Sequence, residues 1–420
     1  MSAEFRLPYG ESELVARVPI ANLSCVLSVK NLPGVTDESK AIKQAITHPI
    51  GSLPLIERIQ ENNKVVVIVT DNTRACPDHK LLPIILAELE KKVARRQITI
   101  VVALGTHAPL INAELIKKLG RNIVENYPVF NHDVNETTKI GVTSRGTPVE
   151  INNRVLQADF RISTGFIEPH FFAGFSGGRK SIAPGVSSAA AIIHNHSYPM
   201  LNSPQAKAGV LAGNPVHEDL VEQAMMAKLD FIVNVLLNNN QEITHIVAGH
   251  PVLAHEQGCA IEKDISQVFL KQKVDISITS NSGAPLDLDF YQTCKGIDTA
   301  AQITRDGGVI IIASSCNAGV GPTAFQTLHE SASCPADVLK KIQVSEPQSI
   351  WWQNQILARA QLNHQIYLLS GLDDRAAEKM MVTPIKSIEE GLDRAFSFLG
   401  KTATVGIIPE GPLVIPVIRG

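Results

Sequence analysis

The chain has 420 residues, 44% of them hydrophobic and 19% charged. This composition lies outside the disordered regime, and the length exceeds that of one ordinary core, which predicts two globular domains. A net charge of -3 without a dense Lys/Arg stripe excludes a nucleic-acid partner. The N-terminus lacks the apolar core of a signal peptide, and no run reaches the roughly 18 apolar residues of a membrane helix. We therefore expect a cytoplasmic protein with no membrane partner.

Short apolar β-branched runs alternate with amphipathic stretches from about residue 64 on. This pattern is typical of a parallel sheet covered by helices. Residues 77–96 carry apolar side chains at helical spacing between the first two runs, which predicts a β-α-β unit. The runs that we expect to form buried strands in this first series are Val65–Thr70, Ile98–Ala103, Phe160–Thr164 and Phe231–Leu237.

A second series of apolar runs begins near Val274 and occupies residues 274–280, 307–314, 366–370 and 402–409. The polar segment EKDISQVFLKQK separates the two series, so we place a domain boundary near residues 265–273. The sequence thus predicts an α/β protein with two domains, each with a mostly parallel sheet covered by helices. The N-terminal domain would span residues 1–268, to which the closing segment 409–420 could return, and the C-terminal domain would span 269–408.

Polar side chains follow the first three apolar runs, where ligands bind in open α/β sheets. Each has a structural alternative. Asp71 is as well suited to a helix cap or a turn, an arginine often forms a surface ion pair, and a single histidine is more often structural. Two histidines at two strand ends favour acid-base chemistry, and an arginine there can grip a carboxylate. The candidate residues are Asp71, Arg74, His107, His170 and Lys180.

The segment GFSGGRKS at 174–181 approaches the phosphate-binding pattern G-x-x-x-x-G-K-[ST]. Arg179 stands where that pattern requires glycine, which argues against an NTPase, although a helix N-terminus there could still hold a phosphate. His194 and His196 follow on an expected loop or strand. Either could ligate a metal, but no set of three or four zinc ligands is visible.

The six cysteines show no metal-ligand spacing and are expected to be reduced and packed in or near the core. They are Cys25, Cys76, Cys259, Cys294, Cys316 and Cys334. In the second series, Tyr291, Gln292 and Lys295 stand at the start of an expected helix. Gln292 and Lys295 are three residues apart and share a face that either binds an anion or is simply solvated.

Taken together, these motifs resemble the nickel-dependent lactate racemase family over most of the chain. The resemblance rests on DNTR at 71–74, GTH at 105–107, EPHFFAGFSGGRKSIAPG at 168–185, His196, and YQTCK at 291–295. It implies a nickel-pincer nucleotide, a pyridinium mononucleotide that holds nickel through two sulfur atoms and a ring carbon and is attached covalently at Lys180. His196 would be the fourth nickel ligand, in a square-planar centre. The loop residues Ser176, Gly177 and Gly178, together with Asp71, would bind the cofactor.

The same resemblance implies roles for the other candidates, with the active site in the cleft between the domains. His107 and His170 would act as general base and acid, Arg74, Gln292 and Lys295 would hold the substrate carboxylate, and Tyr291 and Trp352 would complete the substrate site. The adjacent Trp351 leaves the tryptophan assignment open by one position. Cofactor-maturation proteins are implied as partners.

The implied reaction inverts C2 of a 2-hydroxy acid by hydride transfer through a 2-keto acid, since proton removal beside a carboxylate is difficult. Lactate, malate, aromatic acids and aldonates such as gluconate all remain candidate substrates. Asn72 would suit a polar tail, and the Phe171–Phe172 pair an apolar one. The alternatives are a redox enzyme on 2-hydroxy acids and a non-catalytic anion- or nucleotide-binding protein. The redox enzyme is disfavoured because no complete G-x-G-x-x-G pattern is present.

Overall fold

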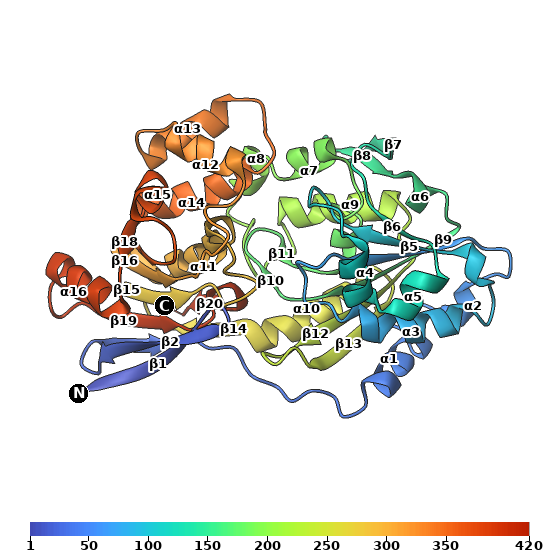
Figure 1. Cartoon of the computed structure of the whole chain (residues 1–420), viewed down its shortest axis with the longest axis horizontal. Helices are drawn as coiled ribbons and strands as arrows, with labels where there is room; N and C mark the ends of the chain where they lie inside the picture. The colour runs from blue at the N-terminus through green and yellow to red at the C-terminus, as the bar shows by residue number, and fades with distance from the viewer. Residues whose placement is uncertain (420) are drawn as a thin grey trace. The chain divides into compact units, whose positions relative to one another are not determined.

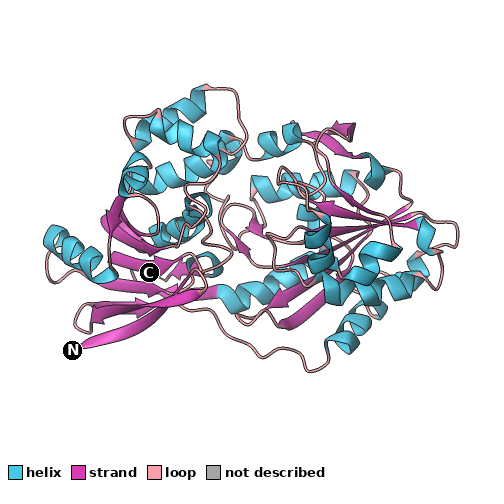
Figure 2. Cartoon of the chain, viewed as in Figure 1, coloured by secondary structure: helices cyan, strands magenta, loops and turns pink. Residues whose placement is uncertain are grey.

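The computed structural model describes residues 1–419 and divides into two compact units. The contiguous unit is Asn31–Asp264, and the composite unit joins Met1–Lys30 to the chain from Ile265 onward. Each unit is built around a six-stranded sheet with flanking helices (Figure 1 and Figure 2). The predicted α/β class, with two largely parallel sheets, is confirmed.

The sheet of the contiguous unit is parallel except for one edge strand, β13, which runs antiparallel to its neighbour. Its strands, in spatial order, are β13 (Ile243–Gly249), β12 (Phe231–Leu237), β9 (Phe160–Phe166), β4 (Val65–Thr70), β5 (Ile98–Ala103) and β6 (Val129–Asn131). The four strands expected from the first apolar series are confirmed, with β9 two residues longer than expected. Two small antiparallel hairpins accompany the sheet: β7 (Thr137–Val142) with β8 (Pro148–Asn152), and β10 (Pro169–His170) with β11 (Gly174–Phe175).

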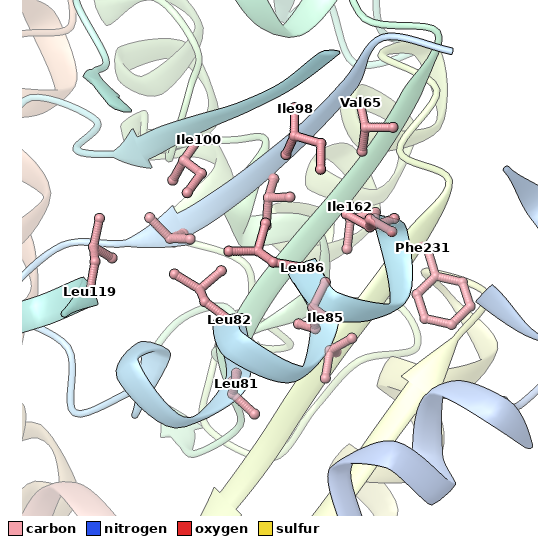
Figure 3. Packing of buried hydrophobic residues seen from close by; sticks show 14 of the residues in the cluster. Val65, Leu81, Leu82, Ile85, Leu86, Ile98, Ile100, Leu119, Ile162 and Phe231 are labelled. Carbon is pink, nitrogen blue, oxygen red and sulfur yellow. The ribbon is translucent and has the colours of Figure 1, made fainter. Parts of the chain in front are cut away.

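Buried side chains cover both faces of this sheet, which explains why its strands read as continuous apolar runs. Val65 and Val67 belong to one hydrophobic cluster, and Val66 and Ile68 to another. Figure 3 shows the first cluster, in which the side chains of α3 pack against β4, β5 and β9. Full burial of one such aliphatic side chain contributes about 1.5–3 kcal/mol to stability.

The helix α3 ends earlier than the sequence pattern suggested, at Leu89 instead of Arg96. Val93 stays buried after the helix has ended, so the apolar spacing continued beyond the helix itself. The helices of the contiguous unit are α1 (Glu38–Thr47), α2 (Leu55–Arg58), α3 (Asp78–Leu89), α4 (Asn112–Leu119), α5 (Arg121–Asn126), α6 (Asn153–Leu156), α7 (Ala189–Asn195), α8 (Tyr198–Leu201), α9 (Pro215–Met226) and α10 (Leu253–Ser266), with 3-10 turns η1 (Arg95–Gln97) and η2 (Gly178–Ser181).

The composite unit has a fully parallel sheet. Its strands, in spatial order, are β18 (Thr383–Ile385), β17 (Gln365–Leu369), β16 (Thr304–Ala313), β15 (Val274–Ser280), β19 (Val405–Ile408) and β3 (Leu23–Val26). Its helices are α11 (Phe290–Ile303), α12 (Thr323–Glu330), α13 (Pro335–Val344), α14 (Trp351–Asn363), α15 (Asp374–Lys379) and α16 (Ile388–Leu399), with the 3-10 turn η3 (Gly411–Leu413). Within residues 1–419, no helix combines the length and apolar character needed to cross a membrane.

The expected division into residues 1–268 and 269–408 is corrected at both ends of the chain. Strand β3 completes the sheet of the composite unit beside β19, and the hairpin of β1 (Ser2–Tyr9) and β2 (Ser12–Pro19) contributes Leu7 and Val18 to its core. The closing segment 409–420 does not return to the first domain. Its strand β20 (Ile415–Ile418) pairs with β14 (Gln267–Leu270) in the composite unit.

The cysteines are all free thiols. Four of them are buried, as expected for core residues. Cys25 is only partly buried, and Cys334 is exposed at the start of α13, so the core assignment was wrong for Cys334.

Candidate active site

The candidate residues of the contiguous unit follow three neighbouring strands, β9, β4 and β5. Because parallel strands end at the same edge of a sheet, the loops after them lie side by side. Asp71 and Arg74 follow β4, His107 follows β5, and His170 follows β9. This arrangement accounts for the contact between Asp71 and His107, which are distant in sequence.

Asp71 and His107 form a carboxylate–imidazole pair. The Asp71 side chain is 3% exposed, and its Oδ2 lies 2.5 Å from Nδ1 of the half-exposed His107. The other carboxylate oxygen of Asp71, Oδ1, accepts from the backbone N–H of Thr73 at 3.1 Å and from the Thr73 hydroxyl at 2.7 Å. Burial alone would raise the pKa of Asp71, but the hydrogen bond and charge of His107 and the charge of Arg74 outweigh it, so the pKa is lowered. Asp71 is therefore an ionised acceptor, to which Nδ1 of His107 donates its proton.

Arg74 lies at the middle of the same loop. Its guanidinium makes no hydrogen bond or salt bridge within residues 1–419, in contrast to its backbone carbonyl, which accepts from Lys118 at 3.0 Å. The neighbouring Asn72 is exposed, and its amide donates to Glu114 on α4 at 3.0 Å. Asn72 is thus engaged in a contact that ties the loop to α4, which argues against its expected role toward a polar substrate tail.

His170 sits in the hairpin formed by β10 and β11. Its Nδ1 accepts from the backbone N–H of Ala173 at 3.3 Å, so the neutral ring carries its proton on Nε2. The ring stacks on Phe171 and meets Phe172 edge-on, with centroid distances of 5.0 Å and 4.6 Å. Both phenylalanines are buried, and their ring contacts orient the histidine.

Phe172 brings together three residues that the sequence singled out separately. Its ring contacts the rings of His170 and His196, the latter edge-on at 4.9 Å, and the ammonium of Lys180 lies 5.9 Å from its centroid. His196 caps the C-terminus of α7, which corrects the expected loop or strand around HNHSYP. Burial, and then the charge of Lys180, lowers the pKa of His196 to about 3. The imidazole is therefore neutral at physiological pH, as a metal ligand must be.

The turn before Lys180 requires glycine. Gly177 and Gly178 have φ of 74° and 52°. A Cβ on Gly177 would lie 2.7 Å from Oδ1 of Asn234, and one on Gly178 would lie 2.6 Å from the ring of His255. The amide of Gly178 donates to the same Asn234 oxygen at 2.7 Å. This turn is therefore packed against Asn234 and His255. In this respect it differs from a loop that wraps around a phosphate.

Ser176 and Arg179 hold the same turn from inside. The Ser176 hydroxyl donates to the carbonyl of Phe166 at 2.7 Å, and the buried Arg179 donates to the carbonyls of Ala173 at 2.7 Å and Gly177 at 3.2 Å. Burial lowers the pKa of Arg179 to about 10, so its guanidinium is still charged at neutral pH. Sequence reasoning treated Arg179 only as a departure from a nucleotide-binding pattern, whereas it connects the hairpin of His170 to the turn of Lys180.

Residues 1–419 do not by themselves provide a set of metal ligands. Across residues 1–419, no group of three or more His, Cys, Asp or Glu side chains could hold a metal ion. His194, the other candidate, is engaged with the hydroxyl of Thr147 at 2.8 Å. A metal bound at His196 would therefore need its remaining ligands from a non-protein group.

The candidates of the composite unit also cluster. Tyr291, Gln292 and Lys295 lie in the first turns of α11, as predicted. Asp289 caps this helix, and its carboxylate accepts from the backbone N–H of Gln292 at 2.8 Å. Trp352 on α14 is 8% exposed and donates from Nε1 to the Tyr291 hydroxyl at 3.0 Å. This contact selects Trp352 over Trp351 as the partner of Tyr291.

Two family models match most of the chain: the lactate racemase N-terminal domain at residues 9–209 and the lactate racemase C-terminal domain at residues 269–416. The chain is 36% identical to the lactate racemase of Thermoanaerobacterium thermosaccharolyticum, over 98% of this chain and 99% of that protein. It is 35% identical to the lactate racemase of Lactiplantibacillus plantarum, over 97% of this chain and 98% of that protein.

Solved structures agree with these matches. The lactate racemase apoprotein of Thermoanaerobacterium thermosaccharolyticum superimposes with a TM-score of 0.95 over 99% of this chain and all of that one, at 36% identity. A Thermotoga maritima protein shares the fold, with a TM-score of 0.68 and 16% identity over 92% of this chain and all of that one. On the strength of both domain matches and of full-length identity above 30%, this chain belongs to the lactate racemase family, a family of isomerases.

Proposed function

We propose that the protein inverts the configuration at C2 of a 2-hydroxy acid, with a nickel-bearing pincer nucleotide attached at Lys180. The observation that carries the proposal is the opposite hydrogen-bonding of the two histidines. Nδ1 of His107 donates to Asp71, whereas Nδ1 of His170 accepts from the backbone N–H of Ala173, so Nε2 of each ring is the nitrogen left to exchange a proton with the substrate. The reaction needs one histidine as neutral imidazole, to accept a proton, and the other as imidazolium, to donate one.

The residues present fit the proposed cofactor. His196 is a buried, neutral imidazole beside the ammonium of Lys180, and residues 1–419 supply no further set of protein ligands. His196 would be the protein ligand of nickel, and Lys180 the point of attachment. When bound, the cofactor supplies the hydride acceptor. Ser176, Gly177 and Gly178 would serve the cofactor site by shaping the turn that presents Lys180, and Asp71 would serve it by fixing the imidazole of His107.

Proton transfer is the task of the chain's own residues. One histidine takes the hydroxyl proton while C2 loses its hydrogen together with the bonding electrons, which leaves a 2-keto acid. When the hydrogen returns to the opposite face of C2, the other histidine protonates the oxygen and the inverted alcohol forms. The two histidines then hold exchanged protonation states, so the reverse reaction proceeds in the same way.

Substrate binding is assigned to the remaining candidates. Arg74 has a guanidinium without a salt bridge in the described chain, which suits bidentate recognition of a carboxylate. Gln292 and Lys295 offer an amide and an ammonium from one helical face, and the hydrogen-bonded pair of Tyr291 and Trp352 lies beside them on α11 and α14. Lactate is the first substrate to test because the relatives above are lactate racemases; malate, an aromatic 2-hydroxy acid and gluconate follow.

Isotope labelling tests the proposal. The protein is produced together with cofactor-maturation proteins and given each enantiomer of lactate deuterated at C2, in ordinary water. We expect inverted product that keeps most of its label, a reaction slower than with unlabelled lactate, and a nucleotide-sized mass on the peptide containing Lys180. Extensive label washout at initial rates would refute hydride transfer. Failure to invert any of the four substrate types, in protein that carries the adduct, would refute the racemase. Keto acid accumulation without inversion would indicate the redox alternative.

A further inference from the structure

A buried ion pair lies beneath the loop that carries Arg74. Lys118 on α4 and Asp78, the first residue of α3, are 9% and 0% exposed in their side chains, and their charged groups are 3.1 Å apart. The same ammonium donates to the carbonyl of Arg74 at 3.0 Å and to that of Cys76 at 2.8 Å. All three N–H donors of Lys118 are therefore engaged, two of them with the backbone of the loop.

Asp78 is in turn held from two strands. The hydroxyl of Thr70, at the end of β4, donates to one carboxylate oxygen at 2.9 Å, and that of Thr164 on β9 donates to the other at 2.5 Å. Its place in the first turn of α3 adds the favourable field of a helix N-terminus. A buried ion pair is seldom more stabilising than an apolar pair of similar volume, because both charges lose their hydration. Stability alone therefore does not account for this arrangement.

The position of Arg74 depends on its backbone. Its guanidinium has no hydrogen bond or salt bridge in the described part of the chain and acts on Asp71 only through its charge. Lys118 holds its carbonyl, and Glu114, one turn earlier on the same face of α4, accepts from Asn72. α4 thus grips the loop at positions 72, 74 and 76.

We propose that Lys118 and Asp78 are positioning residues for substrate binding, which fix the Asp71–Pro77 loop so that Arg74 meets the substrate carboxylate. This inference rests on the proposed function in one respect, the role of Arg74. An arginine that binds the carboxylate equally in the ground and transition states affects mainly KM. We call the contacts of Lys118 with Asp78 and with the Arg74 and Cys76 carbonyls the clamp; its loss is therefore expected to raise KM more than it lowers kcat.

The chain offers a matched control. Lys117 is adjacent to Lys118 on α4, has the same chemistry and is exposed, and in the described chain its side chain makes no hydrogen bond or salt bridge to the loop. In hydrogen–deuterium exchange on the protein without substrate, we expect Lys118→Met to raise exchange at least fivefold in the peptide covering residues 72–76, and Lys117→Met to leave it unchanged. Unchanged exchange in the Lys118 variant would overturn the clamp, whatever the enzyme's activity. If Lys118→Met does not fold, the double variant Asp78→Asn with Lys118→Met is tested in its place, because it removes both buried charges.

Kinetics test the link to Arg74. With lactate and rates normalised to attached cofactor, we expect Lys118→Met to raise KM about 10- to 100-fold while kcat changes less than threefold. In an Arg74→Ala background the same change should alter KM less than twofold, because the two residues act through one contact. A merely structural role would lower the thermal midpoint and the active fraction and leave KM unchanged, which would refute positioning. If the parent enzyme inverts no 2-hydroxy acid, the proposed function fails, while the exchange result still decides the clamp.

Discussion

Asp71→Asn tests whether the carboxylate sets the tautomer of His107. In the wild-type protein one Asp71 oxygen accepts two hydrogen bonds from Thr73, and the other faces Nδ1 of His107. The asparagine carbonyl should stay with Thr73, because reversing the amide would lose two hydrogen bonds and cost about 2–3 kcal/mol. The amide NH₂ then points at Nδ1, which must accept, and the ring proton moves to Nε2. His107 can then act as a base at Nε2 only after the amide reverses, which costs about 2–3 kcal/mol.

The expected loss follows from this energy. A penalty of about 2–3 kcal/mol corresponds to a decrease in kcat of about 30- to 150-fold. We would measure kcat per mole of attached cofactor, and read the tautomer independently from the ¹⁵N shifts of labelled histidine in protein without cofactor. The control is Asp133→Asn, the same change at an exposed carboxylate of the contiguous unit, which should leave both unchanged. A kcat within threefold of wild type, or His107 still protonated on Nδ1, would refute the reasoning.

Three further predictions concern other parts of the molecule. His196→Ala should lose nickel, whereas His170→Ala should keep nickel and lose turnover; metal analysis showing nickel retained at stoichiometry in the first variant contradicts the ligand assignment. Gly177→Ala should lower stability by about 2–4 kcal/mol, because φ is 74° and the new Cβ meets the Phe166 carbonyl at 2.9 Å; an unchanged thermal midpoint argues against it. Burial, only partly offset by the Gln361 hydrogen bond, lowers the pKa of His329 to about 4, so unfolding takes up a proton and stability falls as the pH drops from about 6.5 to 4. Urea unfolding followed by tryptophan fluorescence measures how the free energy of unfolding changes with pH. In His329→Gln this change between about pH 6.5 and 4 should be smaller by the uptake of about one proton. An identical slope in both proteins would contradict the prediction.

The central strands could be read from the sequence because both of their faces are buried. Val65–Thr70, Phe231–Leu237 and Val274–Ser280 match their predicted bounds. Edge strands carry a weaker signal: in β3, Leu23–Val26, only alternate residues are partly buried, and its partner lies near the other end of the chain. Nothing local assigns it to the composite unit, which is why the expected division failed there.

The loops that carry the candidate residues could be read from the sequence, but the contacts of those residues could not. Asp71 and His107 meet because their strands are neighbours, and strand order cannot be read from one sequence. The contact between Phe172 and His170 could not be predicted, because in a sequence an aromatic side chain looks the same whether it lines a pocket or packs against a histidine. Lys117 and Lys118 are identical in sequence terms, yet one is exposed and the other forms a buried ion pair.

The connectivity of the two units imposes an order on folding during synthesis. The contiguous unit is an uninterrupted segment, whose flanking residues Lys30 and Ile265 are hydrogen-bonded to each other at 3.1 Å. Its sheet can form as soon as Asp264 has left the ribosome. Strand β3, made among the first residues, must wait for β19, which emerges only near the end of the chain. At typical elongation rates this delay is tens of seconds, during which an edge strand and the hairpin of β1 and β2 have no sheet to join. We therefore expect truncated chains that end before β19 to retain a folded contiguous unit and an exposed N-terminus that is sensitive to proteases and prone to aggregation.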